Sequence, residues 1–175
     1  MRPDPATYPA YFNNYIKLVN GDNIVSIIET QSPKSIKFYH SLTEEQSTYR
    51  YADGKWTIKE ILQHVIDAER IFTYRALAIA RGEKSPLASF DEGLYARNSR
   101  ANERSWKSLA DEFTVMRAST IAFIKSISEK DYDTFGQVNE YKMAVLAMLF
   151  VIAGHELHHI QIIRERYFDV MIDEK

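Results

Sequence analysis

Three of the chain's five histidines lie close together near its C-terminal end, at positions 155, 158 and 159. In an α-helix, residues four apart project from one face, about 6 Å apart along the axis, so His155 and His159 would point the same way. The other residues of this face are mostly apolar, and a buried polar pair needs partners. A metal ion is one such partner. The apolar neighbours are Val145, Met148, Leu149, Ile152, Ile162 and Ile163.

A third ligand would have to come from another helix, and His64 is the candidate. It lies beside the apolar stripe of a helix that we expect at residues 57–81. Three protein ligands leave a coordination position open for water or substrate, which is typical of a reactive metal site. Asp67, three residues further on, would be a fourth ligand or would accept an imidazole N–H. Arg75 lies on the same helix face and would reach an anionic substrate.

Two other interpretations fit the same residues. Buried histidines can simply be hydrogen-bonded residues of the core. In addition, His155-Glu156-Leu157-His158-His159 satisfies the H-E-x-x-H pattern of zinc proteases. No third histidine follows this pattern, and Glu156 is turned about 100° from His155 on a helix, which argues against a protease. The carboxylates available downstream are Glu165, Asp169, Asp173 and Glu174.

The elements that must position these histidines are helices. Apolar residues recur at helical spacing over residues 22–41, 57–81, 103–127 and 141–168, and a shorter helix is expected at 8–19. Thr57 and Glu60 form a predicted capping box at the start of the second long helix, and Pro33 predicts a kink or break in the first. Residues 83–100 form a long connection and residues 131–139 a loop. We therefore predict an all-α, four-helix bundle with a long crossover, formed by residues 1–175 as one domain, and no sheet.

Composition narrows the class of protein. The chain has 175 residues, a net charge of −2 and no cysteine. A metal site must then use His, Asp, Glu or water, and nothing in the charge indicates nucleic acid as a partner. The apolar run 143–153 is too short to cross a membrane, and the N-terminus lacks the apolar stretch of a signal peptide. We expect a cytoplasmic protein without a membrane partner.

The chain resembles the DinB-like (DinB/YfiT) superfamily. The resemblance rests on residues 56–70, WTIKEILQHVIDAER, which match the pattern W-[ST]-I-x-E-x-x-x-H-x-x-D-x-E, and on residues 153–159, AGHELHH, which match a closing G-H-x-x-H-H segment. The resemblance implies a four-helix bundle that binds a divalent metal, often zinc or nickel, through His64, His155 and His159. It also implies homodimers, and activities that include thiol-dependent transferases and isomerases.

These features support a metal-dependent enzyme as the first hypothesis. A divalent ion held by the three histidines would activate a low-molecular-weight thiol or water for attack on a small electrophile, as in an S-transferase or hydrolase. The alternative is a non-enzymatic bundle for metal binding or dimerisation in a stress response. A metal site that opens to a pocket would favour the enzyme.

Overall fold

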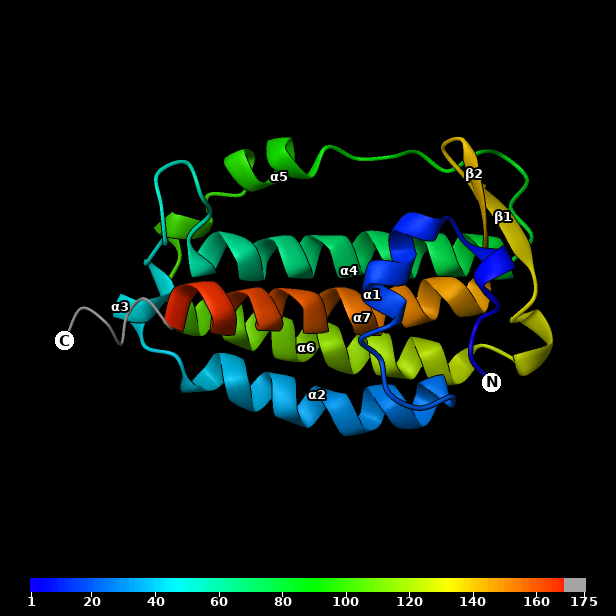
Figure 1. Cartoon of the computed structure of the whole chain (residues 1–175), viewed down its shortest axis with the longest axis horizontal. Coiled ribbons are helices and arrows are strands. Elements are labelled where there is room, and N and C mark those ends of the chain that lie inside the picture. Colours follow the sequence, from blue (N-terminus) through cyan, green and yellow to red (C-terminus); the bar gives the residue numbers. More distant parts are fainter. Residues whose placement is uncertain (169–175) are drawn as a thin grey trace.

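The computed structural model describes residues 1–168, and most of them lie in helices (Figure 1). Four long helices form the bundle: α2 (Ile24–Ser41), α4 (Ile58–Ala80), α6 (Trp106–Ser126) and α7 (Val145–Ile162). In the ring that they make, α7 packs against α4 and α2, and α6 packs against the same two helices. The prediction of an all-α, four-helix bundle is confirmed.

The order of the helices requires the predicted crossover. In Figure 1, α4 and α6 both run from the end of the bundle marked α3 to the end that carries the strands. The chain must therefore return along the whole bundle between them. This return contains α5 (Glu92–Asn98) and a 3₁₀ turn, Ala101–Glu103, and α6 then begins at Trp106, where Ser105 caps it. The predicted start of α6 at residue 103 was three residues early.

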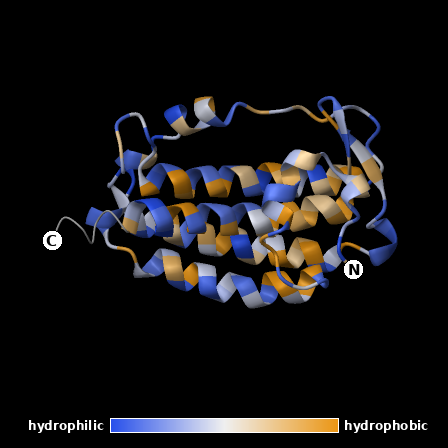
Figure 2. Cartoon of the chain, in the orientation of Figure 1, coloured by the Kyte–Doolittle hydropathy of each residue, from blue (hydrophilic) through white to orange (hydrophobic). Residues whose placement is uncertain are grey.

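Helix α7 is the central element of the core. Its residues from 145 to 156 are all buried, and its N-terminal half is the hydrophobic part in Figure 2. Together with the π-helical turn Ile163–Phe168 it is long and apolar enough to cross a membrane, but 72% of its most apolar window is buried inside the bundle. Its hydrophobicity is therefore accounted for by packing against the other helices.

The prediction of no sheet was wrong. Strands β1 (Phe135–Val138) and β2 (Tyr141–Ala144) form an antiparallel hairpin in which Val138 pairs with Tyr141. Asn139 makes the turn with φ of 50°, a conformation that asparagine tolerates well. Four-residue strands are too short for alternation to be recognised in the sequence. Helix α7 consequently starts at Val145 instead of residue 141.

Two smaller predictions also differ from the structure. The break expected at Pro33 is absent, because Pro33 lies inside α2 without ending it, whereas the kink stays a prediction. Pro33 is exposed, so the carbonyl group that loses its helical donor can bind water instead. Near the N-terminus, the expected helix 8–19 is reduced to 3₁₀ turns at Pro5–Thr7 and Ala10–Phe12 and to α1 (Asn13–Ile16). Helix α1 lies against α7. The remaining short elements are α3 (Glu44–Ser47) and a 3₁₀ turn at Glu129–Asp131.

Candidate metal centre

The structure brings together the three histidines that the sequence singled out. His64 projects from α4, and His155 and His159 project from the facing side of α7. The Nε2 atom of His155 lies 3.1 Å from that of His64 and 3.2 Å from that of His159. The ligand atoms of all three lie within 4.8 Å of one another. Residues about ninety positions apart in the sequence therefore converge on one point between two helices.

Local sequence features hold each helix in place. The capping box at the start of α4 is present, with the Thr57 hydroxyl accepting from Glu60 N–H and the Glu60 carboxylate accepting from Thr57 N–H. On α7, Gly154 allows a close approach of α1, because a Cβ atom at this position would lie 2.3 Å from the Tyr15 carbonyl oxygen. The Tyr15 ring then packs edge-on against His155, with the ring centroids 5.3 Å apart.

Burial keeps these imidazoles neutral. His64 and His155 are 4% exposed and His159 is 9% exposed. Removal from water disfavours the charged form, so it lowers the pKa of His64 to about 4 and lowers the pKa values of His155 and His159 well below the ordinary range. A neutral imidazole has a lone pair on one nitrogen, which is the form that binds a metal. The cluster therefore offers lone pairs near pH 7.

The spacing fits a metal ion better than it fits hydrogen bonds alone. A neutral imidazole nitrogen either donates one hydrogen or accepts one, so His155 Nε2 cannot fully satisfy both of its neighbours. Bonds of about 2.0–2.1 Å from three nitrogens to one ion would place those nitrogens roughly 2.9–3.4 Å apart. The observed Nε2 separations of 3.1 and 3.2 Å fall in this interval. The three side chains are thus suited to hold a divalent cation.

Aromatic rings surround the cluster. The Trp56 ring lies 5.0 Å from His64 and the Phe72 ring 5.3 Å from His155, measured between centroids. The two tryptophans of the chain differ in their surroundings. Trp106 is 4% exposed and donates to the Tyr39 carbonyl, whereas Trp56 is only half-buried and covers His64.

Glu92 is a site residue that the analysis of the sequence did not propose. Its carboxylate reaches to 3.9 Å from His64 Nε2, and 64% of the side chain is exposed. It belongs to α5, which the crossover carries back over α4. Its position depends on the path of the crossover, which no periodicity in the sequence reveals.

Asp67 and Arg75 have other partners in the structure. The Asp67 carboxylate accepts a hydrogen bond from Gln63 and lies 3.7 Å from Arg70, on the side of α4 that faces α6. Arg75 donates to the Ala88 carbonyl and lies over the Phe90 ring, so it attaches the crossover to α4. Neither side chain hydrogen-bonds a cluster histidine in the described part of the chain.

Glu156, the general base of the protease interpretation, points into the core. Its carboxylate accepts from Arg117 at 2.9 Å and from Gln31 at 2.6 Å, and Arg117 also binds Glu69 at 2.6 Å. Arg117 and Glu156 are fully buried. Of the downstream carboxylates, Glu165 accepts from Gln161, and Asp169, Asp173 and Glu174 lie outside the described residues. This arrangement gives Glu156 a structural role in the core, in place of the general-base role of the protease interpretation.

The chain is similar in sequence to known proteins. The model of the DinB superfamily matches residues 28–163. A curated protein of Oceanobacillus iheyensis, named as a "putative metal-dependent hydrolase", is 26% identical over 137 residues, which are 76% of this chain and 77% of that protein.

Two solved structures have a similar fold. YfiT from Bacillus subtilis, described as a "probable metal-dependent hydrolase with an unusual four-helix bundle topology", superposes with a TM-score of 0.73 at 14% identity, covering 97% of this chain and 93% of that one. A mycothiol-dependent maleylpyruvate isomerase superposes with a TM-score of 0.64 at 11% identity. That alignment covers 78% of this chain but only 58% of the isomerase.

Proposed function

From the premise that this chain belongs to the DinB superfamily, we propose that it is an enzyme that binds one divalent metal ion through His64, His155 and His159 and hydrolyses a small-molecule substrate. The observation that carries the proposal is the convergence of three buried, neutral imidazoles with Nε2 separations of 3.1 and 3.2 Å. The names of the Oceanobacillus and Bacillus relatives support hydrolysis as the reaction. Zinc and nickel are the proposed ions.

The residues around such an ion would have different roles. A bound divalent ion would act as a Lewis acid and lower the pKa of water. The histidines hold neutral lone pairs, and the rings of Tyr15, Trp56 and Phe72 restrict access of bulk water to them. Glu92 stands at the exposed side, where its carboxylate can accept the proton of an attacking nucleophile.

A thiol-dependent transferase is the second candidate reaction. It is favoured by the fold shared with the mycothiol-dependent isomerase and by the same need for a proton acceptor near the site. A low-molecular-weight thiol would then replace water as the nucleophile. We also propose that the protein is cytoplasmic and forms a homodimer. Light scattering after gel filtration measures the oligomeric state.

Metal analysis of the purified chain tests the assignment. Chelator-treated protein reloaded with zinc or nickel should bind one ion per chain, and His155→Ala should lose this binding by at least tenfold, since removal of one of three ligands leaves two. His158→Ala is the matched control, because His158 is on the same helix but outside the cluster. Equal binding by His155→Ala and wild type would overturn the metal assignment.

Activity separates the enzyme from a metal-binding bundle without catalysis. Ester, amide and thiol-transfer substrates should be turned over only by the reloaded protein. Glu92→Gln should keep the metal but lower kcat about 100-fold, in line with the usual contribution of a general base. Wild-type turnover by Glu92→Gln would exclude it as the proton acceptor.

A further inference from the structure

A pocket of about 320 Å³ opens beside His159, the most exposed histidine of the cluster. Its wall comes from the turn before α4 and from the end of α7 with the π-helical turn that follows. Trp56 lies in this wall and also packs on His64, so the pocket adjoins two of the three histidines. Its volume is sufficient for a small organic molecule.

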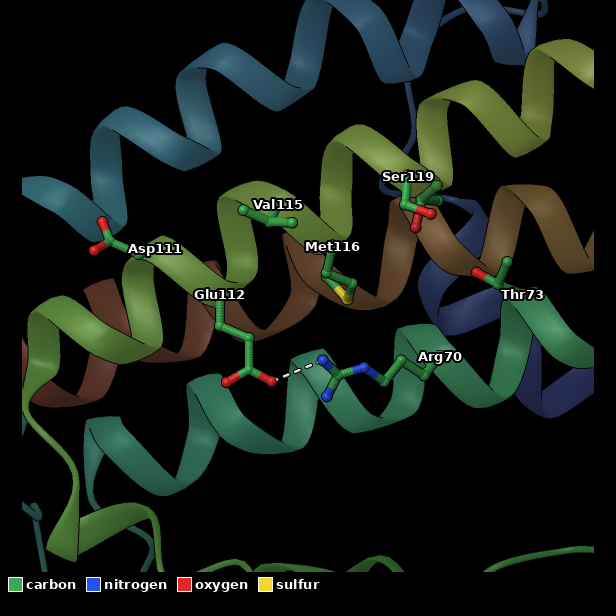
Figure 3. Close-up of a pocket in the computed structure, with 8 residues that line it drawn as sticks. Arg70, Thr73, Asp111, Glu112, Val115, Met116 and Ser119 are labelled. Carbon is green, nitrogen blue, oxygen red and sulfur yellow. Dashed lines mark hydrogen bonds and ion pairs between the residues drawn. The ribbon is translucent and has the colours of Figure 1, made fainter.

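Other cavities lack this relation to the cluster. A larger pocket, of about 620 Å³, lies between α4 and α6 and is lined by none of the three histidines. Figure 3 shows Arg70 paired there with Glu112. Another, of about 370 Å³, lies over α1 and the end of α7, and its wall contains His158 and the carboxylate of Glu165. The pocket beside His159 is lined by a cluster histidine, and none of the described residues in its wall carries a carboxylate.

The charge of this pocket is positive. Lys55 and Arg166 are its charged residues, and both are exposed. Within residues 1–168 neither forms an ion pair with a carboxylate, in contrast to Arg70 and Arg104, which share Glu112. Cations without an ion-pair partner among residues 1–168 can bind a ligand oxyanion, and arginine can bind a carboxylate or phosphate with two parallel hydrogen bonds.

The aromatic residues of the pocket wall contact Arg166 and provide an apolar surface. Arg166 donates weakly to the Tyr51 hydroxyl at 3.4 Å and lies 6.0 Å from the centre of the Tyr51 ring. Tyr51 stacks edge-on against Tyr167, whose hydroxyl donates to the Trp56 carbonyl at 2.7 Å. Tyr51 and Tyr167 therefore link Arg166 to the backbone of Trp56.

We propose that this pocket is the substrate-binding subsite, in which Arg166 and Lys55 bind the carboxylate or phosphate of a small organic anion and Trp56 contacts its apolar part. Its use as a substrate site rests on the proposed function. The reacting group of such a substrate would lie at the His159 end of the pocket, and the anion at the Arg166 end. The subsite selects anionic over neutral substrates.

Ligand titrations test the subsite without any turnover. Benzoate and phenyl phosphate serve as anionic probes and benzamide as the neutral probe of the same shape, added to metal-free and metal-loaded full-length chain. Binding is followed by calorimetry and by the change in tryptophan fluorescence. Trp56 contributes to this fluorescence, so Trp56→Phe should abolish the change in fluorescence on binding. Both anions should bind saturably, and benzamide at least tenfold more weakly.

Substitutions then locate the binding. Arg166→Gln should raise the Kd for the anions about tenfold and Lys55→Gln about threefold, as expected for a charge-assisted hydrogen bond and for an exposed ion pair. Arg164→Gln is the matched control, because Arg164 belongs to the same π-helical turn but lies over Phe38, away from the pocket. It should leave the Kd unchanged.

The results distinguish this subsite from the proposed function. Equal anion binding by wild type, Arg166→Gln and Lys55→Gln overturns the subsite, and so does benzamide binding as tight as that of benzoate. Anion binding that is retained by metal-free protein and weakened by Arg166→Gln supports it, even if metal analysis refutes the metal centre. A raised KM with unchanged kcat for anionic substrates in Arg166→Gln supports its place in catalysis.

Discussion

Replacement of Gly154 by alanine tests how closely α1 packs against α7 beside the histidine cluster. In a helix interior, alanine is favoured over glycine by about 1 kcal/mol, so propensity alone predicts stabilisation. The structure predicts the opposite, because the new Cβ would lie 2.3 Å from the carbonyl oxygen and 2.5 Å from the carbonyl carbon of Tyr15. Ordinary contact begins at 3.4 Å. The backbone of α1 would therefore have to move away from α7 by about 1 Å.

The displacement of α1 determines how much stability the Gly154→Ala substitution costs. Overpacking of a rigid site typically costs 1–3 kcal/mol, and here the contacting atoms are backbone, which cannot rotate away. Helix α1 and the preceding turn bury Phe12 and Ile16 against α7, and these contacts loosen together. We expect Gly154→Ala to lower the free energy of unfolding by about 1–2 kcal/mol after the gain in helix propensity is included.

Urea denaturation of the metal-free protein measures this change, with circular dichroism as the signal. The midpoint should fall while the slope is unchanged, which identifies a loss of native stability. Gly93→Ala is the matched control: its Cβ would meet only side-chain atoms of Arg97 and Asp91, both at 3.3 Å, so it should be neutral or stabilising by up to about 1 kcal/mol. A Gly154→Ala protein as stable as wild type would refute the close-approach argument.

Two further predictions concern buried charge. Arg117→Leu leaves Glu69 and Glu156 buried without their cation and should lower the free energy of unfolding by about 3–5 kcal/mol, measured by urea denaturation. Arg70→Leu is the control at an exposed pair and should lower it by less than about 1 kcal/mol. Equal losses in the two variants would contradict the buried network. The pKa values of the cluster histidines are lower in the folded chain than in the unfolded chain, so the unfolded chain binds more protons below about pH 6.5. Metal-free protein should therefore lose stability as the pH falls from about 6.5 toward 4. The loss should be at most about 1.4 kcal/mol per pH unit for each histidine. A variant with glutamine at all three positions should show a smaller loss over this interval, and an identical pH profile would rule out the cluster as its cause.

The sequence determined the features that depend on neighbours along the chain. The placement of His155 and His159 on one face follows from helix geometry, and the start of α4 follows from the Thr57–Glu60 capping box. The helical periods also predicted the bundle and its long crossover. The continuous apolar run before His155 lies in α7, whose residues from 145 to 156 are all buried.

The hairpin and the extent of the N-terminal helix could not be obtained in this way. Strands of four residues give too few alternating positions for a pattern, and one of the four in β1 is Gly136, which has no side chain. Near the N-terminus, Tyr8 and Phe12 are buried by packing against other elements, so their spacing reflects the core and not a regular helix. In both places tertiary contacts overrule local propensity.

Only the tertiary structure decided which polar groups meet. His64 was a candidate from its helix face, but its distance of 3.1 Å to His155 depends on how α4 packs against α7. Glu92 reaches the cluster because the crossover returns over α4. Arg166 and Lys55 line one pocket because the turn before α4 lies beside the π-helical turn that follows α7. Helix periodicity fixes the direction of a side chain around its own axis, whereas the distance between side chains on different elements is set by packing and by the path of the connections.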